Sequence, residues 1–209
     1  VNFTTLFNGY AARCSGDIVK ISGNTIKKCK AYPIYCNPAS TSYAITLKKN
    51  IITGNSKKID GIRADSGKLI LSSNTISSCS RAIILSSKVK GTVYPNTFKK
   101  NTYNNVKVNS SYVKTLTVKS LSGKSKSAKT ATLNWKKLSS ASGYVVYRSA
   151  SKNGSYTKIS TIKKNKTITY KDSKLKRKST YYYKIVPYTT IGKTTVYGLD
   201  SKIVSIKIK

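Results

Sequence analysis

Three charged residues, Asp60, Arg63 and Asp65, form the one acidic–basic cluster in the first half of the chain that could support acid–base chemistry. The chain has five acidic residues and no histidine, so a nucleophile–histidine–acid triad is impossible unless a lysine acts as the base. Paired carboxylates can cleave glycosidic bonds, whereas calcium needs several oxygen ligands. We expect a turn aspartate at Asp60 and a surface ion pair between Arg63 and Asp65. Catalysis or weak calcium binding by these three residues is the alternative.

Basic residues dominate the composition, because 40 lysines and arginines face five acidic residues, for a formal net charge of +35. Such a charge attracts polyanions, although lysine at alternate strand positions is also typical of an exposed face or a protected sheet edge. Lysine is a point charge rather than a bidentate reader of bases, and no nucleic-acid motif is present. We therefore expect an anionic polysaccharide or cell-wall polymer as partner, and only non-specific contacts with nucleic acid. The candidate binding residues are the basic clusters Lys124, Lys126 and Lys129; Lys163, Lys164 and Lys166; and Lys174, Lys176, Arg177 and Lys178.

The elements that must position these side chains begin with a repeated unit in the first half. Each unit contains an apolar residue, two spacers, Asn, a spacer and then Ile or Phe, and it recurs about every two dozen residues, which is typical of a solenoid. Three short alternating runs per unit predict three strands and three corners. Stacked coils lie about 4.8 Å apart, so we predict a buried hydrogen-bonded column of asparagines, with simple turn formation as the alternative. The column consists of Asn24, Asn50, Asn74 and Asn96.

A second column is predicted slightly further along each unit, from Cys29, Asn55, Cys79 and Asn101. Cys29 and Cys79 are two coils apart there, too far for a disulfide. Cys14 and Cys36 occupy equivalent positions of neighbouring coils, so a disulfide between them is one interpretation; we favour buried thiols that pack as small hydrophobic groups. Without histidine or a Cys-x-x-Cys pair, no metal site is expected.

The motifs Asn24-Thr25-Ile26, Asn50-Ile51-Ile52 and Asn74-Thr75-Ile76, with Asp60-Gly61-Ile62 and Arg81-Ala82-Ile83, resemble the right-handed parallel β-helix of the pectate-lyase-like superfamily. The resemblance covers residues 1–113 and implies about four to five coils. It predicts the fold and leaves the chemistry open, since this scaffold serves lyases, hydrolases and adhesins alike. The family's enzymes use aspartates for calcium and an arginine or lysine as base, which makes Asp60, Arg63 and Asp65 the only candidates here.

The second half, residues 114–209, alternates short apolar runs with polar turns, which predicts a β-sandwich. Leu133-Asn134-Trp135, Gly143-Tyr144-Val145-Val146-Tyr147 and the spacing of Leu175 from Tyr181 resemble a fibronectin type III domain. That spacing is the tyrosine-corner arrangement, which predicts that the Tyr181 hydroxyl turns back to a nearby backbone group. Pro187 departs from that pattern and predicts a bulge or the end of pairing. The expected strands are 116–121, 131–135, 144–148, 156–162, 167–170, 181–188 and 203–208.

These patterns predict an all-β, extracellular or cell-surface protein that has no catalytic role, no cofactor and no membrane span, and that contacts anionic polymers. Open coil ends can also pair with other copies, so self-association into a filament is part of the same hypothesis. The alternative is the C-terminal fragment of a polysaccharide lyase or glycoside hydrolase, which the scarcity of acids disfavours. Because the sequence starts within a repeat and shows no signal peptide, we expect a processed chain or a fragment.

Overall fold

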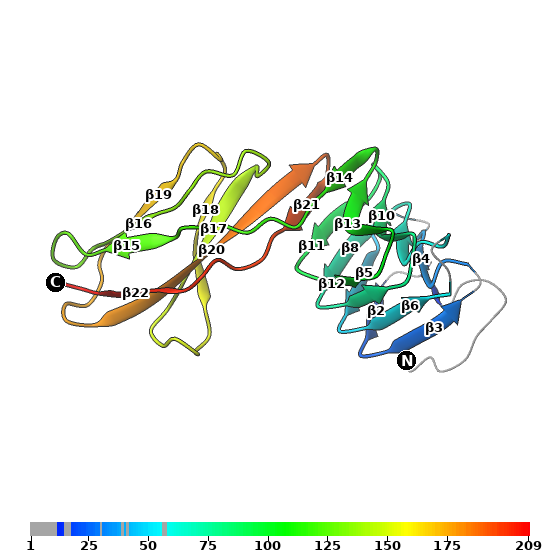
Figure 1. Cartoon of the computed structure of the whole chain (residues 1–209), viewed down its shortest axis with the longest axis horizontal. Coiled ribbons are helices and arrows are strands. Elements are labelled where there is room, and N and C mark those ends of the chain that lie inside the picture. The colour runs from blue at the N-terminus through cyan, green and yellow to red at the C-terminus, as the bar shows by residue number, and fades with distance from the viewer. Residues whose placement is uncertain (1–11, 15–17, 30, 39, 41, 56–57) are drawn as a thin grey trace. The chain divides into compact units, whose positions relative to one another are not determined.

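The computed structural model describes residues 12–14, 18–29, 31–38, 40, 42–55 and 58–209, and all of its described secondary-structure elements are strands (Figure 1). The chain divides into two units. The solenoid unit comprises Val1–Thr115 and Thr190–Val196, and the sandwich unit comprises Leu116–Thr189 and Tyr197–Lys209. The predicted fold class, a parallel β-helix followed by a fibronectin type III sandwich, is confirmed. The sequence did not indicate that residues 190–196 belong with the solenoid.

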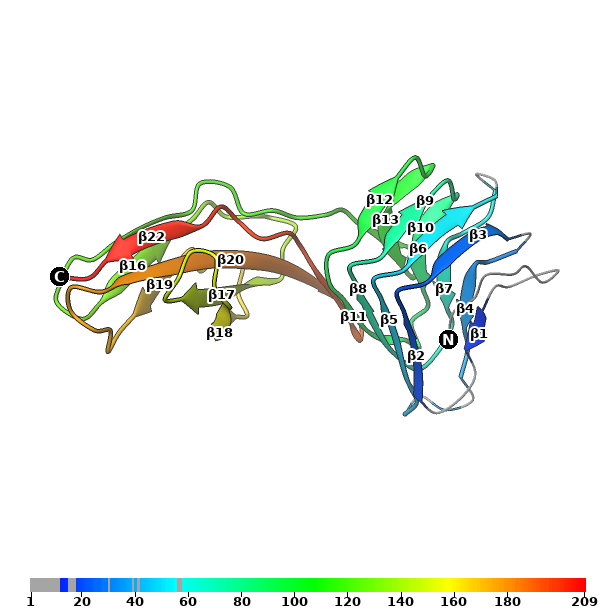
Figure 2. The ribbon, with the colours of Figure 1, turned by 90° about the horizontal axis from the view of Figure 1, so that it is seen from below.

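The solenoid unit has three parallel sheets, whose strands follow one another around each coil (Figure 2). Sheet A contains β1 (Ala12–Cys14), β4 (Ile34–Cys36), β7 (Ile62–Ala64), β10 (Arg81–Leu85), β13 (Tyr103–Val108) and the antiparallel β14 (Ser111–Val113). Sheet B contains β2 (Ile18–Ser22), β5 (Ala44–Lys48), β8 (Lys68–Ser72), β11 (Lys90–Val93) and β21 (Thr194–Tyr197). Sheet C contains β3 (Thr25–Cys29), β6 (Ile51–Gly54), β9 (Thr75–Ser77) and β12 (Thr97–Lys99).

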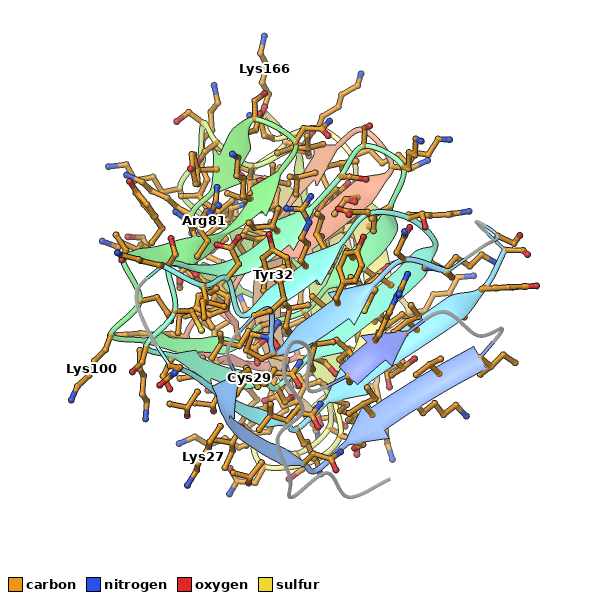
Figure 3. All side chains as sticks on the ribbon, turned by 90° about the vertical axis from the view of Figure 1, so that its right-hand side faces the viewer. Lys27, Cys29, Tyr32, Arg81, Lys100 and Lys166 are labelled. Atoms are coloured by element: carbon orange, nitrogen blue, oxygen red, sulfur yellow. The ribbon has the colours of Figure 1, made fainter. Side chains whose placement is uncertain are left out.

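Alternation of side chains along these strands produces the core. In sheet C, Ile26, Ile52, Ile76 and Phe98 are in register on successive coils, and the three isoleucines are at most 3% exposed. The strand residues that alternate with these four are exposed or half-buried, and Lys27 and Lys100 project outward from the solenoid (Figure 3). The period-two pattern therefore separates an apolar interior from a lysine-rich exterior.

The four repeated asparagines lie in one column at the corner between sheets B and C. The side-chain oxygen of Asn50 accepts the backbone N–H of Asn24 at 3.0 Å, and Asn74 does the same for Asn50 at 3.0 Å. Asn96 accepts the backbone N–H of Asn74 at 2.9 Å. Asn24, Asn50 and Asn74 are at most 3% exposed. Each amide thus satisfies backbone groups that the bend would otherwise leave buried and unpaired.

The residue before each of the first three asparagines has a left-handed backbone: φ is 72° at Gly23, 55° at Lys49 and 56° at Ser73. Only the first of these is a glycine, the residue that adopts this conformation without strain. The asparagine hydrogen bonds therefore hold a bend that lysine and serine disfavour by roughly 1–2 kcal/mol each.

The second predicted column differs from expectation at Asn55, which is exposed. The register between β3 and β6 shifts after Lys27, so Gly54 pairs with Cys29. A Cβ on Gly54 would lie 2.8 Å from the sulfur of Cys79, so only glycine fits between the thiols. Asn101 does lie in this column, and its side-chain oxygen accepts the backbone N–H of Cys79 at 2.9 Å.

Two strands cover the C-terminal edges of the coils. In sheet A, β14 pairs antiparallel with β13, and in sheet B, β21 pairs parallel with β11. Thr194 is 1% exposed; its hydroxyl donates to the carbonyl of Val89 at 3.0 Å and accepts the N–H of Gly91 at 3.3 Å. The C-terminal coil end that the sequence suggested is therefore covered by one further strand in each of two sheets, and β14 is the last strand of sheet A.

The sandwich unit has two antiparallel layers. One contains β15 (Ser122–Lys124), β16 (Ala131–Asn134) and β19 (Thr169–Asp172), and the other contains β17 (Gly143–Ser149), β18 (Thr157–Ile162), β20 (Thr180–Ile191) and β22 (Val204–Lys207). Between the layers, Trp135 contacts Tyr144 edge to face at 5.3 Å, and Tyr144 is fully buried. The first strand differs from expectation, since residues 116–121 contribute only an isolated bridge from Thr117 to Leu199.

The prediction for Pro187 is wrong, because β20 continues through it to Ile191 with no shift in its register against β17. The carbonyl of Pro187 accepts the N–H of Gly198 at 2.8 Å. In an antiparallel sheet, the backbone N and O of one residue point to the same side of the strand. Since the carbonyl of Pro187 points to Gly198, its missing N–H also lies on the side away from β17, and no hydrogen bond to β17 is lost.

Candidate functional site

The outward face of sheet A carries a column of side chains that the repeat places in register. Arg13 pairs with Tyr35 and Tyr35 with Arg63, followed by Ile84, Lys107 and Tyr112 on the next strands. In β4 and β7 the residues on either side of the column are buried, so the middle residue points outward. Three of the five arginines of this lysine-dominated chain, Arg13, Arg63 and Arg81, lie on this sheet.

The first part of this face centres on Arg63. Its Nε donates to Asp65 at 3.1 Å and its Nη1 donates to the hydroxyl of Tyr32 at 3.3 Å, while its guanidinium lies 5.3 Å from the centre of that ring. The hydroxyl of Tyr35 donates to the other oxygen of Asp65 at 2.8 Å. The rings of Tyr32 and Tyr35 are 6.1 Å apart. These contacts hold two tyrosines, an arginine and a carboxylate in one fixed arrangement.

The second part lies around Arg81 and two exposed tyrosines. Arg81 donates two hydrogen bonds to Asp60, at 2.8 and 3.1 Å. Tyr103, in register with Arg81, and Tyr112 are 48% and 47% exposed, and their ring centres lie 5.7 Å apart. The ammonium of Lys107 lies 5.4 Å from the centre of the Tyr112 ring. We call the two parts together the tyrosine–arginine face; it consists of Tyr32, Tyr35, Arg63, Asp65, Arg81, Tyr103, Lys107 and Tyr112.

Both aspartates of the predicted charged cluster are held in ion pairs, with different partners. The hydrogen bond that Arg81 donates to Asp60 raises the pKa of Arg81, and partial burial only partly opposes it. Partial burial acts to lower the pKa of Arg63, but the charge and hydrogen bond of Asp65 outweigh it and raise the pKa. The cluster of residues 60, 63 and 65 is thus divided between two pairs. Asp60 is 3% exposed, so its carboxylate is a structural partner of Arg81 rather than an accessible base.

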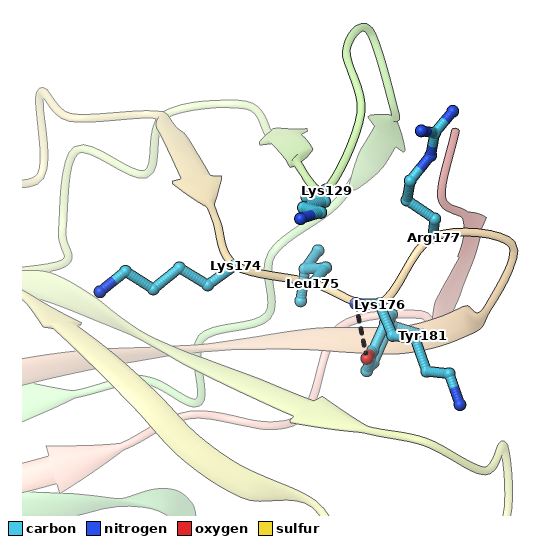
Figure 4. Close-up of a pocket in the computed structure, with 6 residues that line it drawn as sticks. All are labelled: Lys129, Lys174, Leu175, Lys176, Arg177 and Tyr181. Carbon is cyan, nitrogen blue, oxygen red and sulfur yellow. Dashed lines mark hydrogen bonds between the residues drawn. The ribbon is translucent and has the colours of Figure 1, made fainter.

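The predicted basic clusters of the sandwich unit are brought together only in part. Lys129 lies beside Lys174, Lys176 and Arg177 around a hollow with a cavity volume of about 670 Å³, whose other lining residues are Leu175 and Tyr181 (Figure 4). The predicted residues that do not line this hollow are Lys124, Lys126, Lys163, Lys164, Lys166 and Lys178.

The four cysteines are free and buried. Cys14 and Cys36 pair in register across β1 and β4, and no disulfide joins them. A hydrogen bond between the two thiols lowers the pKa of Cys14, while the same bond and burial raise that of Cys36. The favoured interpretation of buried thiols therefore holds, the alternative disulfide is not formed, and the sulfurs lie in the core with the other apolar side chains.

Burial raises the pKa of the Cys79 thiol to about 11, with a smaller contribution from the charge of Asp60. Because an unfolded thiol ionises near pH 8.5, the unfolded state loses its proton first as the pH rises. The contribution of the protonated Cys79 thiol to the free energy of unfolding is therefore complete below that pH, and it is lost as the pH rises through 11. We expect native Cys79 to resist iodoacetamide at pH 8, as followed by peptide mass spectrometry, and Cys79→Ala to lose less stability between pH 8 and 11 than the parent. Rapid alkylation of the native thiol at pH 8 would contradict this account.

Residues 2–127 match the model of a family described as "Periplasmic copper-binding protein (NosD)". The chain belongs to this family. A search of the curated proteins found no match. A Fn3-like protein from Clostridium thermocellum is 29% identical, with a TM-score of 0.38, over 43% of this chain and 88% of that protein. The FN1–FN3 domains of chicken CNTN1 are 17% identical, with a TM-score of 0.40, over 50% of this chain and 35% of theirs.

Membership of the NosD family supports an extracytoplasmic protein of the β-helix type. It does not single out the pectate-lyase-like enzymes that the sequence motifs resemble. Within the part of the chain that the structure describes, no helix is long and apolar enough to span a membrane. The sequence motifs had located the coils and the asparagines, but not Tyr32, Tyr35, Tyr103 and Tyr112. Their only signal is position: Tyr35 directly precedes the inward-facing Cys36, as Arg63 precedes Ala64.

Proposed function

We propose that this member of the NosD family is an extracellular, non-catalytic binding protein whose tyrosine–arginine face holds the sugar chain of an anionic envelope polymer. One observation carries the proposal: aromatic rings and hydrogen-bonding charged groups are in register along sheet A, one coil after another. A polymer that runs across the coils at steps of about 4.8 Å would meet a tyrosine, arginine or lysine on every strand of the column except β10, where Ile84 stands.

The chemistry of the face suits a carbohydrate. Tyr103 and Tyr112 expose nearly half of their surface, and an aromatic ring offers a large apolar area with little conformational entropy to lose. Arg63 and Arg81 are each about a third exposed, beside their aspartates. Arginine and carboxylate groups fixed in pairs can exchange hydrogen bonds with neighbouring hydroxyl groups. These features favour a polyhydroxylated ligand over a purely apolar one.

The preference for an anionic polymer follows from charge. Arg81 and Arg63 are balanced by their aspartates, but Lys107 contacts a tyrosine ring and Arg13 has an exposed side chain on the same sheet. The net charge of +35 adds a positive potential over the whole molecule, and such a potential raises the association rate with polyanions.

The absence of a catalytic role is part of the proposal. A glycosidase of the common type uses two carboxyl groups that flank the scissile bond. Here Asp60 is buried against Arg81, and Asp65 accepts hydrogen bonds from Arg63 and Tyr35. No specific feature of this face favours the alternative of a lyase or hydrolase over binding.

The family description names copper, and the residues present do not fit a copper site with three or more ligands. Among the described residues, no three histidine, cysteine, aspartate or glutamate side chains are grouped for a metal ion. The sequence also has neither histidine nor methionine, which are common copper ligands together with cysteine. The proposed function therefore uses no metal.

We expect the double variant Tyr103→Ala/Tyr112→Ala to bind a soluble anionic polysaccharide, such as polygalacturonate, at least about tenfold more weakly than the parent, because truncation of an aromatic anchor typically costs more than about 1 kcal/mol. Isothermal titration calorimetry at about 0.15 M salt measures the affinity while it screens the general attraction of the charged surface.

Tyr94→Ala is the matched control, since Tyr94 is 41% exposed and follows β11 in sheet B. It should change the affinity by less than about twofold. Binding that is absent in the parent, or that is weakened equally by both variants, would refute the proposed role of the face. Release of shortened or unsaturated sugars from the polymer would refute the non-catalytic assignment.

A further inference from the structure

The hollow between Lys129 and residues 174–177 belongs to the sandwich unit and is separate from the tyrosine–arginine face. Two loops distant in sequence form it, and the backbone N–H of Leu175 donates to the carbonyl of Lys129 at 3.0 Å. The hydroxyl of Tyr181 accepts the N–H of Lys176 at 3.3 Å, which fixes the second loop on β20. This bond is the tyrosine-corner contact that the spacing of Leu175 and Tyr181 predicted. The hollow therefore has a fixed backbone.

Its floor is apolar and its rim is cationic. Leu175 is 3% exposed and contributes to the sandwich core, whereas Lys129, Lys174, Lys176 and Arg177 are exposed. Figure 4 shows the side chains of Lys174, Lys176 and Arg177 extending from the loop in different directions around Leu175. Long basic side chains in this arrangement can fold over a ligand that rests on the floor, since each has several rotatable bonds.

The cations of the rim are not neutralised within the unit. The aspartates of the sandwich unit are committed elsewhere: Asp172 pairs with Arg148 at 3.0 Å, and Asp200 pairs with Lys184 at 2.7 Å. None of the four ion pairs among the described residues involves a residue of the rim. Four positive groups around one hollow repel each other, and a bound anion would relieve that repulsion.

The backbone of the rim is held in a conformation that lysine disfavours. Lys129 and Lys174 both have φ of 60°, and Lys178, at the end of the loop, has φ of 61°. Left-handed backbone costs a residue other than glycine roughly 1–2 kcal/mol. Such residues persist where the surrounding structure fixes the backbone, so the loop that carries the rim is held in one conformation.

We infer that the hollow is a binding site for a phosphate or sulfate group carried on an anionic polymer. The planar guanidinium of Arg177 matches the oxygen geometry of both groups, and the three lysines supply further charge-assisted hydrogen bonds. The inference deepens the proposed function and rests on it for the polymeric nature of the ligand. It adds a second contact with a different chemical preference from that of the tyrosine–arginine face.

The test compares two triple variants of the full chain that remove the same charge. The hollow variant is Lys129→Asn/Lys176→Gln/Arg177→Gln, in which asparagine tolerates the left-handed backbone. The control variant is Lys163→Gln/Lys164→Gln/Lys166→Gln, from the exposed cluster that does not line the hollow. Each variant is tested with dextran sulfate and with polyphosphate, so that recognition of a sulfate group is distinguished from recognition of a phosphate group. Affinity is measured at several salt concentrations, because the slope of its logarithm reports the number of ions released.

The hollow variant should lose at least about tenfold in affinity for one or both polymers and show a shallower salt slope, whereas the control should lose less than about threefold. Equal losses in both variants would mean diffuse attraction and overturn the inference, as would a parent that binds neither polymer. In the parent, titration with inorganic phosphate should shift the NMR methyl signals of Leu175; a response confined to other residues would also overturn it. Polygalacturonate binding that still depends on Tyr103 and Tyr112 would show that the proposed function survives such a failure.

Discussion

Replacement of Asn74 by alanine should lower the free energy of unfolding of the solenoid unit by about 3 to 6 kcal/mol, since each buried polar group left without a partner costs about 1–3 kcal/mol. The oxygen of Asn74 accepts both the backbone N–H and the side-chain N–H of Asn50, at 3.0 and 2.9 Å. Its own amide donates to the carbonyl of Leu47 at 2.9 Å. Asn74 is fully buried, so water cannot replace these bonds. Urea unfolding followed by circular dichroism measures the effect.

Asn55→Ala is the control for this experiment. Asn55 was predicted to stand in a second buried column but is exposed, so its loss should change stability by less than about 0.5 kcal/mol. A similar loss of stability in the two variants would contradict the assigned register of sheet C. An unchanged midpoint for Asn74→Ala would show that the amide column contributes little and that the apolar core alone holds the coils.

Replacement of Asp172 by alanine should destabilise the sandwich unit by about 2 to 4 kcal/mol, because removal of one partner leaves the other polar groups buried and unpaired. One oxygen of Asp172 accepts the hydroxyl of the fully buried Tyr183 at 2.9 Å and Nη1 of Arg148 at 3.0 Å. Burial and the neighbouring charge of Asp172 raise the pKa of Tyr183, so its hydroxyl stays protonated and donates. Thermal unfolding at neutral pH measures the loss.

Asp200→Ala removes the same charge from an exposed pair with Lys184, in which the aspartate side chain is 54% exposed. A surface pair of this kind contributes at most about 1 kcal/mol. The Asp172→Asn variant keeps an oxygen that can accept the Tyr183 hydroxyl, so its melting temperature should lie between those of the Asp172→Ala and Asp200→Ala variants. Equal melting temperatures for the Asp172→Ala and Asp200→Ala variants would contradict a buried structural role for Asp172.

The local features of the fold could be predicted where each residue carries its own signal. The recurrence of Asn before Ile or Phe is local and periodic, so it located the strands of sheets B and C and the bend between them. The Leu175–Tyr181 spacing likewise predicted a hydrogen bond between the Tyr181 hydroxyl and a nearby backbone group, which proves to be the N–H of Lys176, because a tyrosine corner spans only a few residues. Asn55 could not be placed in this way, since one register shift after Lys27 moves every following side chain to a different position.

The candidate sites were predictable only as residue types. The sequence pointed to Asp60, Arg63 and Asp65 as one cluster because they are close in the chain. In space Arg63 forms the expected ion pair with Asp65, but Asp60 pairs with Arg81 and Arg63 also contacts Tyr32. Those partners lie a full coil away, and the number of residues per coil varies, so spacing along the sequence does not reveal them. The lysine clusters were recognised by density, yet only the folding of two loops together selects Lys129 and residues 174–177.

The sequence by itself determined the repeat, the division into a solenoid and a sandwich, and a strongly positive charge, because periodicity and composition are properties of the chain. Only the tertiary structure decided which tyrosines and arginines share the face of sheet A, which cations surround one hollow, and which aspartates are already paired. It also decided that residues 190–196 close the edge of sheet B. The physical reason is that these contacts depend on register and on loops that meet across long sequence separations, and a single chain encodes them only through the packing of its whole core.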